Sequence, residues 1–170
     1  QVLQGKAMGY NGTGHLLEAI SNDRDDTVLG NGEIDAQGNF TLELNAPLSS
    51  EFLNETTFCS GINQSIRSAS TSTIWIKDGS TIVGLIGQAS SRNLVNKTET
   101  VGKIGTRMYV EEDKDIVGTG NCEGSAVKYN LNLKKGWNIV IGENSLETGI
   151  SLYTSPSSAD LKWFFFTKGN

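Results

Sequence analysis

Hydrophobic and polar residues alternate along short stretches of this chain, which is the two-residue period of strands with one buried face. In "NFTLELN", Phe40, Leu42 and Leu44 alternate with polar residues. The loop before them ends at Gly38, where a three-residue hairpin needs a left-handed residue, so we expect Ile34 to pair with Phe40. This segment therefore predicts a β-hairpin.

A second hairpin is predicted in "TIWIKDGSTIVGLIGQ", where Asp78 and Gly79 join two runs rich in β-branched residues. Both faces of the first run are apolar, because Trp75 points away from Ile74 and Ile76. A strand that is apolar on both faces is usually central in a sandwich or lies beneath a covering loop. We expect one of these two positions for this strand.

A third hairpin is predicted around the Lys-Lys-Gly turn that ends at Gly136. In that register Leu133 pairs with Trp137 and Leu131 pairs with Ile139, so the indole shares the apolar face of the preceding strand. We expect Trp137 to anchor the core. The alternative is that its ring is a platform on which a ligand stacks.

Two further segments are expected to be strands. The segment 98–113 is a long strand interrupted by glycines, which indicate bulges or bends. In "DLKWFFFTK" both faces are apolar, and we expect both to be covered. Leu161, Trp163 and Phe165 share one face, and Phe164 and Phe166 share the other.

The whole chain predicts an all-β fold, an antiparallel β-sandwich or a partly closed barrel of about eight to ten strands. We expect a single domain over residues 1–170, because a chain of this length can bury a core of its own. With 20 Gly, 2 Pro and many Ser, Thr and Asn residues, the composition suits short strands joined by turns. Helical character is weak everywhere, including "SSEFLNET" at 49–56.

The charge and hydropathy of the chain exclude two classes of partner. The net charge is −5, and no basic cluster is larger than Lys134-Lys135, so nucleic acid is not an expected partner. No run approaches the roughly 18 apolar residues of a membrane-spanning helix, so no membrane span is expected. We expect a soluble domain.

The two cysteines lie in Ser- and Gly-rich contexts without metal-ligand spacing, Cys59 in "TFCSG" and Cys122 in "TGNCEG". We expect a disulfide between them. It would close a loop of roughly 60 residues and would imply an oxidising compartment. The alternative is two separate buried thiols.

Several short motifs are spread over the chain: "GEIDAQGNFTLEL" followed by "NAPL", then "CSG", "MYVEEDKDIVGTGNC", "GWN" and the closing "LKW". Together they resemble a group of uncharacterised exported all-β domains from deinococcal bacteria, and the likeness spans most of the chain. The resemblance implies export to the cell envelope, in the periplasm or outside the cell, and in some members a lipid anchor. It supplies no catalytic residues, because no activity is assigned to the group.

Residues suited to catalysis or metal binding are few. His15 is the only histidine and no G-x-S-x-G motif occurs, so we expect neither a hydrolytic triad nor a zinc site, and no cofactor. "GTGNCEG" lacks the spacing of a dinucleotide-binding loop. The acidic stretches "SNDRDDTVLGNGEID" and "EEDKD" are interpreted as solvated loops, with calcium binding as the alternative.

We expect an exported structural or interaction module of the cell envelope without catalytic activity, whose partner is an envelope protein or a glycan. The alternative is a module that binds a carbohydrate or a small apolar ligand through aromatic side chains. The candidates for that site are aromatic residues beyond those that the core requires, namely Trp75, Tyr153, Phe164 and Phe166.

Overall fold

The computed structural model describes residues 1–168 and shows an all-β fold, as predicted. It has fourteen strands in place of the predicted eight to ten, because several polar Ser- and Thr-rich stretches form strands as well. The strands are β1 (Val2–Met8), β2 (His15–Ile20), β3 (Val28–Ile34), β4 (Asn39–Leu44), β5 (Asn54–Thr57), β6 (Ser65–Thr71), β7 (Thr73–Asp78), β8 (Thr81–Ala89), β9 (Gly102–Val110), β10 (Lys114–Cys122), β11 (Ser125–Leu133), β12 (Gly136–Ser145), β13 (Gly149–Ser155) and β14 (Lys162–Thr167).

Helix is limited to two short pieces in this part of the chain. A 3-10 turn, η1, spans Ser50–Phe52 within the segment of weak helical character, and α1 spans Arg92–Val95. Neither is long and apolar enough to cross a membrane.

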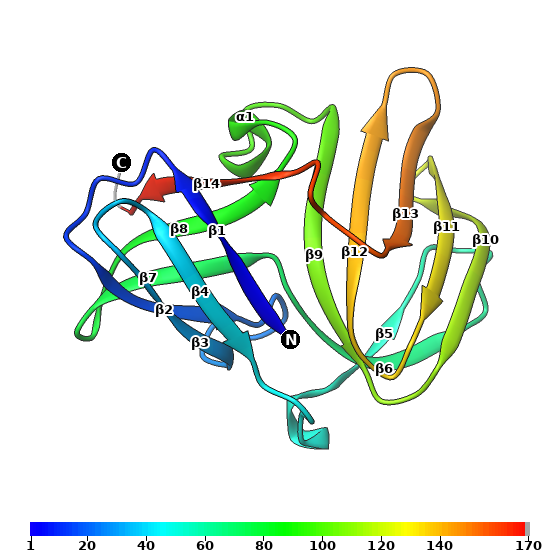
Figure 1. Ribbon diagram of the computed structural model, residues 1–170. Helices are drawn as coiled ribbons and strands as arrows, with labels where there is room; N and C mark the ends of the chain where they lie inside the picture. The colour runs from blue at the N-terminus through cyan, green and yellow to red at the C-terminus, as the bar shows by residue number, and fades with distance from the viewer. Residues whose placement is uncertain (169–170) are drawn as a thin grey trace.

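Seven of the strands close into a barrel (Figure 1, left). Around the barrel the order is β8-β14-β1-β4-β3-β2-β7, and β7 pairs again with β8. Every neighbouring pair is antiparallel except β1 and β14, which are parallel. The barrel, one of the two predicted arrangements, is therefore confirmed, and its strands are mostly antiparallel.

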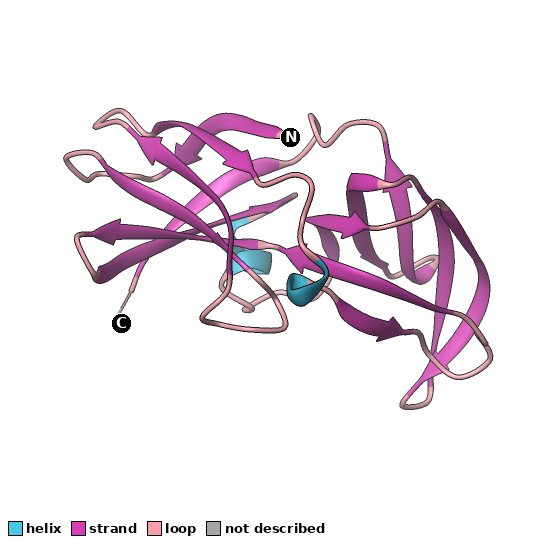
Figure 2. Cartoon of the chain, turned by 90° about the horizontal axis from the view of Figure 1, so that it is seen from below, coloured by secondary structure: helices cyan, strands magenta, loops and turns pink. Residues whose placement is uncertain are grey.

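The other seven strands form a second, curved part of the sheet beside the barrel (Figures 1 and 2). Their order is β5-β6-β9-β12-β13-β11-β10, and β11 and β13 are parallel. β9 connects the two parts, because its Ile104 and Gly105 pair with Ala89 and Gln88 of β8. At this junction, residues of the barrel lie next to residues of the second part of the sheet.

Three hydrophobic cores stabilise the fold. The barrel core is filled by inward residues such as Leu42, Ile76 and Phe165, and the second core, under the curved strands, includes Val110 and Leu133. The third lies beneath η1 and contains Leu29, Leu48, Leu53, Ala69 and Tyr109. Trp137 is partly buried and packs against both the barrel core and the third core.

Two of the three predicted hairpins are present. Ile34 pairs with Phe40, and Gly38 has a φ of 85°, both as predicted. The second hairpin pairs Asp78 with Thr81, so its two-residue loop is Gly79-Ser80, one residue later than the predicted turn. Local turn chemistry was sufficient to predict these two elements.

The predicted hairpin between β11 and β12 is wrong. β13 lies between these two strands, parallel to β11 and antiparallel to β12. Trp137 consequently pairs with Tyr109 of β9 and not with Leu133. Its Nε1 donates a hydrogen bond to the carbonyl oxygen of Asn45 at 2.8 Å, and the indole packs against two cores. The prediction that Trp137 anchors a core is confirmed, although its neighbours differ.

Replacing Gly136 by valine should destabilise the protein by about 1 to 3 kcal/mol, because a β-branched side chain is strained at its φ of 100°. No atom of residues 1–168 lies within 4 Å of the Cβ position of Gly136, so the expected cost is backbone strain and not a Cβ clash. Lys135→Ala, at an exposed position, is the matched control. Thermal unfolding should give a clearly lower Tm for Gly136→Val, and equal Tm values would contradict the strain argument.

The disulfide between Cys59 and Cys122 is present, with a Cα–Cα distance of 5.0 Å. Cys59 is buried in the second core, where the Tyr129 hydroxyl donates to its Sγ at 2.9 Å and accepts from its backbone N–H at 3.2 Å. The bond ties the segment after β5 to the end of β10. A disulfide is consistent with an oxidising, extracytoplasmic location.

Candidate functional site

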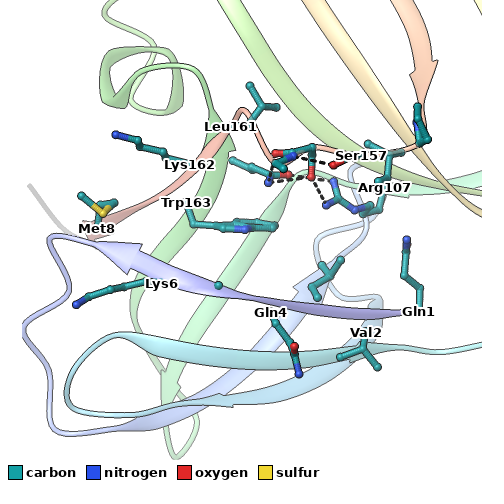
Figure 3. A pocket seen from close by; sticks show the side chains of 17 residues that line it. Gln1, Val2, Gln4, Lys6, Met8, Arg107, Ser157, Leu161, Lys162 and Trp163 are labelled. Carbon is teal, nitrogen blue, oxygen red and sulfur yellow. Dashed lines mark hydrogen bonds between the residues drawn. The ribbon is translucent and has the colours of Figure 1, made fainter.

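The barrel is open along part of the seam between β1 and β14. These strands pair at only two positions, Ala7 with Trp163 and Met8 with Phe164. Because β14 begins only at Lys162, the residues of β1 before Ala7 pair only with β4. The gap forms a cleft of about 550 Å³ that is lined by β1, by the loop before β14 and by residues of β8, β9 and β12 (Figure 3).

Trp163 forms the inner wall of this cleft. Its indole is almost fully buried and packs edge to face against Phe40, with ring centroids 5.2 Å apart. Gly5 of β1 allows this approach, because a Cβ atom there would lie 2.7 Å from Cδ1 of Trp163. The aromatic wall therefore depends on a glycine in the facing strand.

Arg107 of β9 lies at one end of the cleft with 5% of its surface exposed. Its Nη1 donates to Oε1 of Gln88 at 3.1 Å, and its Nη2 donates to Oγ of Ser158 at 3.0 Å. Its Nε is buried and has no hydrogen-bond partner in the described part of the chain. No carboxylate within residues 1–168 forms an ion pair with Arg107, so this buried cation lacks a counter-charge.

The electrostatics of the cleft favour an anion. Burial lowers the pKa of Arg107 to about 10, which still leaves the guanidinium charged at neutral pH. Lys6 and Lys162 add two exposed ammonium groups to the lining. No Asp or Glu lines the cleft in the part of the chain that the structure describes, although the chain carries a net charge of −5. The lining of the cleft is therefore positively charged, whereas the net charge of the chain is negative.

The groups that line the cleft are suited to binding. A guanidinium, the amide of Gln88 and the hydroxyl of Ser158 can hold an anionic group, and Leu161 and Trp163 can contact an apolar one. Among residues 1–168, no His, Cys, Asp or Glu lines this cleft.

Three of the four aromatic residues predicted as a ligand site lie on one outer face of the barrel. Trp75 of β7 pairs with Leu85 of β8, which pairs with Phe166 of β14, and Phe164 lies two residues before Phe166. Tyr153 lies on β13 in the other part of the sheet. The structure therefore brings Trp75, Phe164 and Phe166 together and leaves Tyr153 apart.

The α1 segment covers part of this outer face. The guanidinium carbon of Arg92 lies 4.1 Å from the ring centroid of Phe166, and Val95 packs over Gly87, where a Cβ atom would be 2.6 Å from its Cγ1. The ring face of Phe166 is thus occupied by an arginine of the same chain. This contact covers an apolar side chain of β14, whose two faces were both expected to be covered. Trp75, on the strand expected to be central or to lie beneath a loop, is partly exposed.

The remaining candidates have structural contacts. His15, at the start of β2, has its Nδ1 2.6 Å from the Tyr10 hydroxyl. The carboxylate of Asp113 accepts from the backbone N–H of Lys135 at 2.8 Å, a hydrogen bond that lowers its pKa. No group of three or more His, Cys, Asp or Glu side chains in residues 1–168 is arranged to hold a metal ion.

Sequence reasoning missed Arg107, Gln88 and Ser158. One signal was present in "GTRMYV". There Arg107 begins a run that is otherwise apolar, and this run has long or aromatic side chains on both faces of the strand. Residues 107–110 are all buried, so the arginine lies inside the protein. An arginine in a strand that is buried on both faces is an indication of a buried cation.

Comparison with known proteins adds no functional information. The sequence matches no protein family model, and neither the characterised proteins nor the solved structures that were compared give a match.

Proposed function

We propose that this protein is an extracytoplasmic binding module without catalytic activity, and that its ligand binds in the cleft through an anionic group. The observation that carries the proposal is the buried guanidinium of Arg107, which has no carboxylate partner among residues 1–168 and lies in a cleft that none of their acidic side chains lines. The disulfide supports the extracytoplasmic part of the proposal.

A buried charge without a counter-charge is costly, by several kcal/mol even after relaxation. Two protein acceptors serve Arg107, whereas a guanidinium has five N–H donors. A carboxylate would supply charge and acceptors together, and its own desolvation would be offset by the pairing. The adjacent indole and Leu161 favour a ligand with an apolar group next to that carboxylate.

The simplest test uses benzoate as a probe and benzamide as its neutral analogue of the same shape. In ¹H–¹⁵N NMR titrations we expect benzoate to shift the Arg107 Nε–H and Trp163 Nε1–H signals. Benzamide should bind at least about tenfold more weakly, since it lacks the charge that a buried cation selects.

Arg107→Gln should weaken benzoate binding by at least about tenfold, because the charge is lost while a polar amide remains. Lys128→Gln is the matched control, since it removes one positive charge from an exposed position on β11, outside the cleft. Equal benzoate and benzamide affinities, or equal affinities for Arg107→Gln and Lys128→Gln, would rule out an anion site at Arg107.

We further propose that the module acts in the cell envelope, where its partner is an envelope protein or a glycan. The disulfide supports export in this proposal, because the bond between Cys59 and Cys122 requires an oxidising compartment for its formation. Cell fractionation with a trypsin-accessibility assay on intact cells tests the placement, and a reduced protein confined to the cytoplasm would contradict it.

A further inference from the structure

One edge of β1 has no neighbouring strand along the cleft. Leu44 N donates to Gln1 O at 2.8 Å, so the odd-numbered backbone groups of β1 face β4. In an antiparallel pair the backbone groups of successive residues point to opposite sides, so those of Val2 and Gln4 point to the other edge. No strand within residues 1–168 pairs with that edge before Ala7.

The cleft follows this free edge. Its lining includes six consecutive residues, Gln1 to Lys6, and consecutive residues of a strand point to opposite faces. A cleft that contacts all of them must run along the strand's edge and not over one face. Free strand edges in this position accept an extended peptide as an additional strand. The free stretch Val2–Gly5 is about 13 Å long, which suits about four peptide residues.

The charge lies at one end of the edge. Figure 3 shows Arg107 on the side of Gln1 and Val2, whereas Lys6 and Met8 lie at the other end of β1. A peptide strand antiparallel to β1 ends on the Gln1 side, so its terminal carboxylate reaches the end that holds Arg107. A parallel strand would place its carboxylate at the Met8 end.

We propose that the cleft binds the carboxyl-terminal residues of an extended peptide, added to β1 as an antiparallel strand with its terminal carboxylate at Arg107. The inference rests on the proposed function and names the class of ligand. Backbone hydrogen bonds to Val2 and Gln4 supply binding that depends little on sequence, and Arg107 selects a free chain end. Alternate peptide side chains face Trp163 and Leu161, which favours apolar residues there.

The test uses two pools of acetylated pentapeptides, randomised at every position, that end either in a free carboxylate or in a carboxamide. We expect the carboxylate pool to shift the NMR signals of the Val2 and Gln4 amides and to slow their hydrogen exchange at least tenfold. The carboxamide pool should bind at least tenfold more weakly. Peptides N-methylated at alternate residues should lose protection of the β1 amides, because the paired donors are gone.

Gln4→Pro tests the strand edge directly. Proline removes an N–H that points away from β4, so the β1–β4 ladder keeps its bonds. This variant should bind the carboxylate pool at least tenfold more weakly than Gln4→Ala, which keeps the backbone N–H. Circular dichroism checks that both variants are folded.

The possible outcomes separate the two proposals. Benzoate binding without any response of the β1 amides to either pool would overturn the peptide inference and leave the anion site standing. Failure of benzoate to bind would overturn the proposed function. Equal binding of the two pools would show that the terminal carboxylate is not recognised, and it would overturn the inference. A dimer in light scattering whose Val2 and Gln4 amides are protected without peptide would assign the edge to a second copy and overturn the inference.

Discussion

Reduction of the Cys59–Cys122 disulfide is expected to lower the free energy of unfolding by about 4 kcal/mol. The bond joins residues 63 apart in sequence, and closure of a loop of that length restricts the unfolded chain by this amount in the chain-entropy model. For a domain of this size the loss corresponds to a Tm lower by about 8 to 16 °C.

Calorimetry with and without reductant measures this effect, and Cys59→Ala/Cys122→Ala is the matching variant, which reductant should leave unchanged. Alkylation of the unfolded, unreduced protein followed by mass spectrometry tests the bond itself. Two alkylatable thiols in protein never exposed to reductant would contradict the disulfide and the oxidising compartment inferred from it.

Gly32→Ala is expected to prevent folding or to destabilise the protein by more than about 4 kcal/mol. A Cβ atom at this position of β3 would lie 2.1 Å from the carbonyl oxygen of Thr41 and 2.6 Å from Cα of Leu42. These contacts are with the backbone of the paired strand β4, so no side-chain rotation relieves them. The two strands of the hairpin would have to separate and expose Leu42, which is fully buried.

Gly142→Ala is the matched control, because the nearest atom to its Cβ position is Cδ2 of Leu152 at 3.9 Å, an ordinary contact. Soluble expression and urea unfolding of the two variants give the comparison. Similar urea midpoints for both variants would show that β3 and β4 can move apart at little cost, which would contradict the predicted clash with the β4 backbone.

The elements that could be predicted from sequence are those whose strands are neighbours along the chain. The hairpin that pairs Ile34 with Phe40 follows from alternation and one glycine, and the turn at Gly79 follows from the same signals. Such pairs need little loop closure, so local residues determine them.

Pairings between distant segments could not be predicted in this way. The signal at Gly136 is a genuine left-handed residue, but β13 pairs with both flanking strands and separates them. The cleft could not be predicted from the sequence for the same reason. Its lining residues Gln4, Gln88, Arg107 and Trp163 are far apart in sequence. Their proximity depends on the closure of the barrel by β1 and β14.

Closure of the barrel by β14 also determines when β1 can complete its pairing as the chain is synthesised. β14 emerges from the ribosome long after β1, whereas β9 to β13 follow one another along the chain and can associate first. Folds that depend on such distant contacts form slowly, and their unpaired strand edges are open to association in the meantime. Before β14 arrives, β1 can pair with β4 and is free along the whole of its other edge. In the finished barrel only Ala7 and Met8 gain a partner there, so an exposed edge of the nascent chain persists as the wall of the cleft.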